Sequence, residues 1–201
     1  MRMLGALRRA AICFAVALPA LCVSVNPVSA SIVRFLSVEE LSQASSDVVR
    51  GRVVGQTVHW TPHHEGIYTK VQIEVLEALQ GEASPGRRMT IIQAGGTIDG
   101  VSLDWTGRPV FTDGEDLILF LQPYEPGNPA DGRHLVVGGK QGRMTVVSDP
   151  SGLMARRDLI GLSEAPFVEG AAPAHPPARR DLLPLDDLRQ RLRRAPKGST
   201  P

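Results

Sequence analysis

The clearest pattern in the chain is a strict alternation of apolar and polar residues within Tyr68–Leu79. Val71, Ile73 and Val75 fall on one face, and the polar residues between them fall on the other. A period of two over this length predicts a β-strand with one buried face and one solvated face.

Four further apolar or β-branched runs, separated by turns rich in Gly, Pro and Asp, predict more antiparallel strands. These runs are Val48–Trp60, Met89–Ala94, Leu117–Leu121 and Leu135–Val147, the last interrupted by Gly138, Gly139 and Gly142. In the first run, Gly51 and Gly55 predict a bulge or bend that coils the strand. Leu117–Leu121 is apolar at every position, so we expect it at the centre of the sheet with both faces buried.

Two segments have helical patterns. Ser37 and Glu40 have the spacing of a capping box, which predicts a short helix within Ser31–Ser46. Near the other end, Leu182–Arg194 has three leucines at helical spacing, and from Arg179 onward the chain has seven basic and three acidic residues. Three interpretations of this tail are open. It docks its leucines on the strands, it binds a partner or an anionic surface through its arginines, or it is disordered.

These elements predict a mainly β fold: a small five-stranded OB-like antiparallel barrel with a short N-terminal helix and a basic helical C-terminal tail. The expected organisation is a leader, a lead-in with the helix, the barrel, an Ala/Pro-rich linker and the tail. Their ranges are 1–30, 31–46, 47–161, 162–181 and 182–201.

The N-terminal segment has the three parts of a secretory signal. Its first nine residues have three arginines and no acidic residue, Ala10–Val25 is apolar, and Val28–Ala30 offers small residues for a signal peptidase. The apolar run is shorter than the roughly 20 residues that span a bilayer. We expect cleavage between Ala30 and Ser31, export to the periplasm or the medium, and no transmembrane segment after cleavage.

Removal of the leader changes the composition. Cys13 and Cys22 both lie in it, so the processed chain would have no disulfide even in an oxidising compartment. Of the 22 Lys and Arg residues, the leader holds three, which leaves 19 against 21 acidic residues and a net charge of −2. This balance does not favour nucleic-acid binding.

Short motifs in the expected strands resemble the netrin-module proteins, which include the tissue inhibitors of metalloproteinases. The motifs are Ser46–Val54, Val75–Gly81, Gly100–Leu103 and Gly114–Phe120, within a matched region of about Asp47–Gln122. The resemblance implies the fold and suggests protease inhibition. Those inhibitors place an N-terminal cysteine on the zinc of the protease, whereas this processed chain would begin near Ser31 without cysteine, so the inhibitory residues do not carry over.

Three histidines, His59, His63 and His64, cluster with Glu65 between the first two strands. Imidazole and carboxylate groups at this spacing suggest a zinc or copper site, but no cysteine accompanies them, and a solvated hairpin tip explains them better. We therefore assign no metal ligands. His64-Glu65 begins an H-E-x-x-H pattern, which fails because Tyr68 stands where the second histidine belongs.

Other chemical motifs have structural explanations. The acids Asp113, Glu115 and Asp116 are interpreted as a hairpin corner, because calcium loops need ligands spread over about a dozen residues. Gly138–Gly142 lacks the spacing of a phosphate-binding loop and is interpreted as a bend. Since no nucleophile motif occurs either, we predict no catalytic residues and no cofactor.

The sequence therefore favours a non-enzymatic exported binding module that contacts another envelope or secreted protein through loops at 58–68 and 97–112. Trp60, Tyr68 and Trp105 are its predicted partner-binding residues, because rigid aromatic side chains near loop ends often anchor contacts. Core packing is the alternative role for these three residues. The alternative functions are a protease inhibitor of the netrin-module type and a metal-binding envelope protein.

Overall fold

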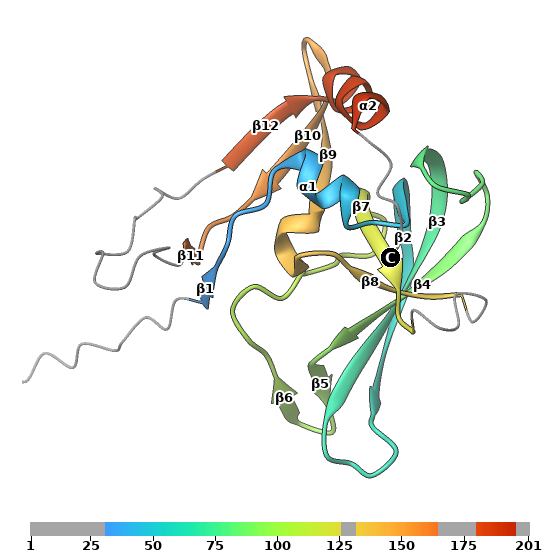
Figure 1. The fold of residues 1–201 in the computed structure, drawn as a ribbon. Helices are drawn as coiled ribbons and strands as arrows, with labels where there is room; N and C mark the ends of the chain where they lie inside the picture. The colour runs from blue at the N-terminus through green and yellow to red at the C-terminus, as the bar shows by residue number, and fades with distance from the viewer. Residues whose placement is uncertain (1–30, 126–131, 165–179, 196–201) are drawn as a thin grey trace, which may run out of the picture.

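The computed structural model describes residues 31–125, 132–164 and 180–195, and it is mainly β with one short helix near each end of that range (Figure 1). The predicted leader with Ala30, and most of the predicted linker, lie outside the described residues. The elements are β1 (Ser31–Val33), α1 (Val38–Gln43), β2 (Asp47–Trp60), β3 (Ile67–Gln80), β4 (Arg88–Ala94), β5 (Gly96–Ile98), β6 (Val101–Leu103), β7 (Asp116–Pro123), β8 (Arg133–Val136), the 3₁₀ turn η2 (Gly139–Gly142), β9 (Arg143–Asp149), β10 (Gly152–Asp158), β11 (Leu162–Glu164), β12 (Arg180–Pro184) and α2 (Leu185–Arg194).

The helix α1 and the strands β2, β3, β4 and β7 form where the sequence predicts a helix and the first four of its five strands. The Ser37 side chain accepts a hydrogen bond from the Glu40 backbone N–H at 3.1 Å, and the Glu40 carboxylate accepts one from the Ser37 N–H at 2.8 Å. This confirms the capping box of α1. In the β2–β3 pair the register shifts at Arg50/Gly51 and at Val53/Gly55, where the bend was expected.

Eight strands form the main sheet, in the order β12-β10-β9-β7-β2-β3-β4-β8. The strand β8 also pairs with β7, so β2, β3, β4, β8 and β7 make a ring of five strands within the larger sheet. The pairing of β8 with β4 is parallel, which departs from the expected all-antiparallel arrangement.

The predicted strand Leu135–Val147 is wrong, because its residues form two strands on either side of a turn. Gly138 and Gly139 have φ values of 66° and 59°, a conformation that favours glycine and starts η2. The chain therefore leaves β8 and returns as β9, which pairs with the strand β7 at Leu117–Leu119.

Two hydrophobic cores lie on opposite faces of β7, which explains why this strand is apolar at every position from Leu117 to Leu121. The odd-numbered residues face the ring core and the even-numbered ones face the helix-covered core. The ring core contains Val49, Val53, Val71, Ile73, Val75, Ala83, Met89, Ile91, Phe111, Leu117, Leu119 and Leu121. The helix-covered core contains Val38, Leu41, Val48, Ile118, Phe120, Val137, Met144, Ala155, Leu185, Leu188 and Leu192.

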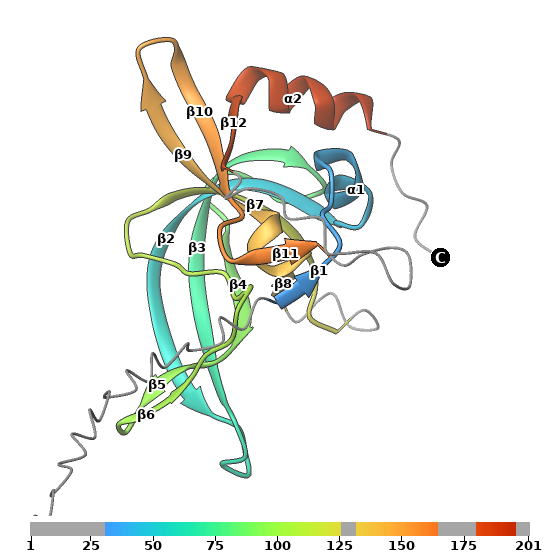
Figure 2. The ribbon, with the colours of Figure 1, turned by 90° about the vertical axis from the view of Figure 1, so that its left-hand side faces the viewer.

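The C-terminal helix docks on the sheet, so of the three interpretations of the tail the described residues show the first. Leu185, Leu188 and Leu192 are buried in the helix-covered core, and α2 contacts α1 (Figure 2). The helix begins at Leu185 and not at Leu182, because Arg180–Pro184 forms β12 and pairs with β10. Among the described residues, no helix combines the length and the apolar character that crossing a bilayer requires.

Candidate functional site

Of the two segments singled out in the sequence, 58–68 meets the first part of 97–112 at the end of the molecule that lies away from α1 and α2, whereas Phe111 is buried in the ring core (Figures 1 and 2). We call this region the arm end: the tip of the β2–β3 hairpin, the β5–β6 hairpin and residues 104–108. Gly95 and Gly96 bring the hairpin there, with φ values of 91° and 140°. A Cβ on Gly96 would lie 2.8 Å from the Val58 Cγ1 and 2.7 Å from the Thr69 Oγ1, so β5 crosses β2 and β3 at close contact.

The β5–β6 hairpin was missed in the sequence analysis. Its turn is Asp99-Gly100, and both residues have positive φ, 52° and 77°. An Asp-Gly pair between short β-prone runs is a strong signal for such a two-residue turn and could have revealed it. The side chains of Thr97 and Ser102 also hydrogen bond across the two strands at 2.8 Å.

Trp60 joins the two hairpins. Its indole N–H donates a hydrogen bond of 2.9 Å to the carboxylate of Asp99, and its ring stacks on His64 with centroids 5.5 Å apart. Asp99 is in the left-handed conformation at the tip of the β5–β6 hairpin. The turn that the sequence left undetected therefore supplies the partner of a predicted binding residue.

Tyr68 lies on the opposite face of the arm from Trp60. It is directly opposite His59 in the β2–β3 register, whereas Trp60 is opposite Ile67, and successive residues of a strand alternate between faces. The Tyr68 ring stacks on His59 at 5.3 Å, and the Lys70 ammonium lies 5.9 Å from the ring centroid. The structure thus does not place Tyr68 on one surface with Trp60.

An apolar stripe follows β6. Val101, Leu103 and Trp105 occur at two-residue intervals and are 48%, 41% and 45% exposed. The Trp105 ring lies against the backbone of Gly95, where an added Cβ would be 3.1 Å from the ring. Among the described residues, β6 pairs only with β5, so its outer edge has no strand beside it. The exposed stripe and the unpaired edge therefore belong to the same short strand and its continuation.

The charges beside this stripe are fixed locally. Asp104 accepts hydrogen bonds from the Arg108 guanidinium at 2.6 Å and from the Trp105 backbone N–H at 2.9 Å. The bond from Arg108 is the main reason why the pKa of Asp104 lies below its ordinary value. The carboxylate therefore stays charged and holds the turn that presents Trp105.

The histidines of the hairpin tip do not converge. His59 stacks on Tyr68 and hydrogen bonds to Thr57, His64 stacks on Trp60, and His63 is exposed. Within residues 31–125, 132–164 and 180–195, no three His, Cys, Asp or Glu side chains gather closely enough to hold a metal ion.

The acids near the turn before β7 act in ion pairs rather than as the solvated corner expected from the sequence. Asp116 accepts two hydrogen bonds from Arg50, at 3.0 and 2.7 Å, and Glu115 pairs with Arg143. The first pair ties β2 to β7 within the ring, and the second ties the turn before β7 to β9, which lies outside the ring. Asp113, in contrast, is exposed, and its side chain accepts a hydrogen bond of 3.1 Å from the amide of Gln56.

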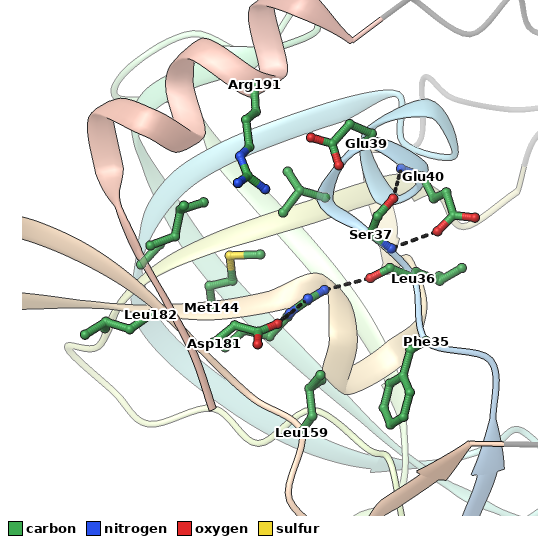
Figure 3. Close-up of a pocket in the computed structure, with 14 residues that line it drawn as sticks. Phe35, Leu36, Ser37, Glu39, Glu40, Met144, Leu159, Asp181, Leu182 and Arg191 are labelled. Carbon is green, nitrogen blue, oxygen red and sulfur yellow. Dashed lines mark hydrogen bonds and ion pairs between the residues drawn. The ribbon is translucent and has the colours of Figure 1, made fainter. Parts of the chain in front are cut away.

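At the other end of the molecule α1 and α2 cover the sheet, and we call this region the helix end. It contains a pocket of about 590 Å³, which the sequence analysis did not anticipate (Figure 3). Its walls come from residues 35–40 before and in α1, from β9 and β10, and from β12 and α2. Because these segments are far apart in the sequence, no local pattern could have indicated the pocket.

No protein-family model matches the chain, and comparison with curated proteins gives no significant match. The arm end and the pocket therefore have to be interpreted from their own geometry.

Proposed function

We propose that this chain is an exported, non-enzymatic binding module that contacts another envelope or secreted protein through its arm end. The observation that carries the proposal is the exposed apolar stripe of Val101, Leu103 and Trp105 on the open edge of β6. An unpaired strand edge exposes backbone N–H and C=O groups, which an extended segment of another protein can pair with.

The composition of this surface suits a protein partner. Trp105 offers a large, rigid apolar surface, and the stripe is bordered by the charged pair of Asp104 and Arg108. Protein interfaces typically combine an aromatic anchor with a polar rim. Trp60 contributes by holding the β5–β6 hairpin through Asp99, and Tyr68 belongs to the opposite face of the arm.

The finer description of the fold is part of the same proposal. The ring of β2, β3, β4, β8 and β7 supports an OB-like barrel of the netrin-module kind, with function in its loops. Export rests on the leader predicted in the sequence, which would deliver the module to the periplasm or the medium.

Neither alternative function has a specific observation in its favour. A netrin-type inhibitor would insert its N-terminal residues into a protease, whereas Ser31–Val33 pairs in parallel with β11. For a metal-binding role, the histidines of the tip stack on aromatic rings and do not share one site.

Site-specific photocrosslinking in the native host tests the proposal. A photoreactive phenylalanine analogue replaces Leu103 in one strain and Leu153 in a control strain, because both side chains are similarly exposed at 41% and 38%. We expect position 103 to crosslink to a defined exported protein that position 153 does not reach. Substitution of Trp105 by Ala should reduce the yield of that product about tenfold or more, since buried aromatic anchors dominate interfaces.

Two results would overturn the proposal: crosslinking to the same proteins from both positions, or an unchanged yield in the Trp105→Ala strain. The test also requires that the Trp105→Ala variant folds. An unfolding midpoint equal to that of the unchanged protein would establish this, as is usual for a substitution at an exposed position.

A further inference from the structure

The pocket at the helix end is a second site, independent of the proposed function. Its volume of about 590 Å³ lies within the roughly 300–1,000 Å³ typical of small-molecule sites. Apolar side chains of Val38, Met144 and Leu183 line it together with charged ones. Figure 3 shows it open between α1 on one side and β12 with α2 on the other.

Buried polar contacts hold the walls of this pocket in place. The Gln141 side chain accepts a hydrogen bond from the Leu36 N–H at 2.8 Å and donates one to the Arg34 carbonyl at 3.0 Å. Its amide thus pairs with the backbone of the lead-in in the way that the backbone of a neighbouring strand would. Arg157 donates to the Leu36 carbonyl at 2.8 Å and to the Asp181 carboxylate. These contacts fix the lead-in before α1 relative to β10 and β12, so the pocket is preformed.

Most charged groups that line the pocket are already paired. Arg157 is paired with Asp181, and Glu40 is paired with Arg34. The carboxylate of Glu40 also accepts the Ser37 N–H, and these contacts lower its pKa. A ligand would therefore gain little by competing for these groups.

Two opposite charges on facing walls, the half-buried Glu39 and the exposed Arg191, have no charged partner among the described residues. The side chains of Glu39 on α1 and Arg191 on α2 make no hydrogen bond or ion pair with the described residues. Figure 3 shows Arg191 reaching from α2 into the pocket and Glu39 across from it. Each charge suits its own helix, since Glu39 is in the first turn of α1 and Arg191 in the last turn of α2. The site can thus carry both charges without a ligand.

We infer that this pocket binds a short peptide with apolar side chains by its two charged ends. Glu39 accepts hydrogen bonds from the free α-ammonium group, and Arg191 donates hydrogen bonds to the free α-carboxylate. The apolar side chains of the peptide lie against Val38, Met144 and Leu183. The volume suits a di- or tripeptide rather than a longer chain, which would have to leave the pocket.

Isothermal titration calorimetry tests this inference on the protein purified from cells that express the full chain. The probes are dileucine and trileucine with free ends, and the matched controls are the same peptides with an acetylated N-terminus or an amidated C-terminus. We expect a free-ended peptide to bind at least tenfold more tightly than either capped form, because each cap removes one charged contact.

Variants assign the two contacts. Arg191→Gln should weaken binding of the free-ended peptide about tenfold and leave binding of the amidated peptide unchanged. Glu39→Gln should also weaken binding of the free-ended peptide about tenfold, but it should leave binding of the acetylated peptide unchanged. Arg193→Gln and Asp187→Asn are the controls, because both residues are exposed on α2 and do not line the pocket. These controls should bind as the unchanged protein does.

Three outcomes would overturn the inference: no binding of either free-ended peptide at millimolar concentration, equal binding of free and capped peptides, or equal binding by Arg191→Gln and the unchanged protein. Crosslinking from position 103 should persist in Arg191→Gln, so failure of this site is distinguishable from failure of the proposed function.

Discussion

The helix end and the arm end are built on the same two strands but differ in what covers them. In β2, the side chains of Val48, Val49 and Val53 are buried, whereas none of the side chains from Val54 to Trp60 is buried. At the helix end, α2 covers the sheet with three buried leucines. At the arm end, the two short strands β5 and β6 lie on it, and β6 leaves its own apolar residues exposed.

The polar contacts at the two ends differ in the same direction. At the helix end, Arg189 on α2 donates two hydrogen bonds to Glu77 on β3, at 2.8 and 2.7 Å, and a third to Asp186. At the arm end, Trp60 donates one hydrogen bond to Asp99, and Thr69 on β3 donates one of 2.6 Å to the Gly95 carbonyl just before β5. From this difference we predict that local stability is higher at the helix end than at the arm end.

Removal of a core side chain at the helix end should have the largest effect. Leu188 on α2 is 0% exposed, so Leu188→Ala should lower the free energy of unfolding by about 2–5 kcal/mol through lost burial and a cavity. Urea denaturation followed by circular dichroism measures the change.

The matched variant at the arm end is Leu103→Ala, which should change the free energy of unfolding by less than about 0.5 kcal/mol because the side chain is exposed. If the two variants lose similar amounts of stability, the proposed division between the two ends is wrong.

The ion pair that ties α2 to β3 should have a smaller, pH-dependent effect. Hydrogen bonds from Arg189 hold the pKa of Glu77 below its ordinary value in the folded protein. Stabilisation by this pair is therefore present above the unfolded pKa of the carboxyl group and is lost as the pH falls through the lowered folded pKa. Glu77→Gln should reduce the free energy of unfolding by about 1 kcal/mol at pH 7, because both side chains are partly exposed.

Urea denaturation at pH 7, 5 and 3 measures this dependence. The difference between Glu77→Gln and the unchanged protein should be constant at the two higher pH values and shrink at pH 3. Glu82→Gln serves as the control, because its exposed carboxylate makes no contact with the described residues. A difference that grows towards low pH would contradict the assignment.

Where the sequence pattern is local and strong, it predicted the elements of both ends. The alternation in β3, the glycine bends of β2 and the capping box of α1 each follow from a few neighbouring residues, and the structure confirms them. The burial of both faces of β7 could also be predicted, because an apolar run without polar interruption has no face to solvate.

Features that depend on distant pairing could not be predicted in this way. The strand β12 falls in a segment expected as linker and tail, and it forms because Arg180–Pro184 pairs with β10 while Arg157 holds Asp181. The sequence around Gln141 predicts a glycine bend, and nothing in its neighbours indicates that its amide holds the lead-in more than 100 residues away. The pocket results from these same long-range contacts, so it could not be predicted from local sequence patterns either.

The most local effect is expected at the hydrogen bond that joins the two hairpins of the arm end. Trp60→Phe removes the hydrogen bond to Asp99 but keeps an aromatic ring beside His64. It should therefore lower the free energy for local opening of the β5–β6 hairpin by about 1 kcal/mol. Amide hydrogen exchange in β5 and β6 should accelerate about fivefold while exchange in β7 stays unchanged. Trp105→Phe is the control, because the indole N–H of Trp105 has no hydrogen-bond partner among the described residues. Faster exchange throughout β7 in Trp60→Phe would mean that the arm end opens only with the whole sheet, and the separation of the two ends would then fail.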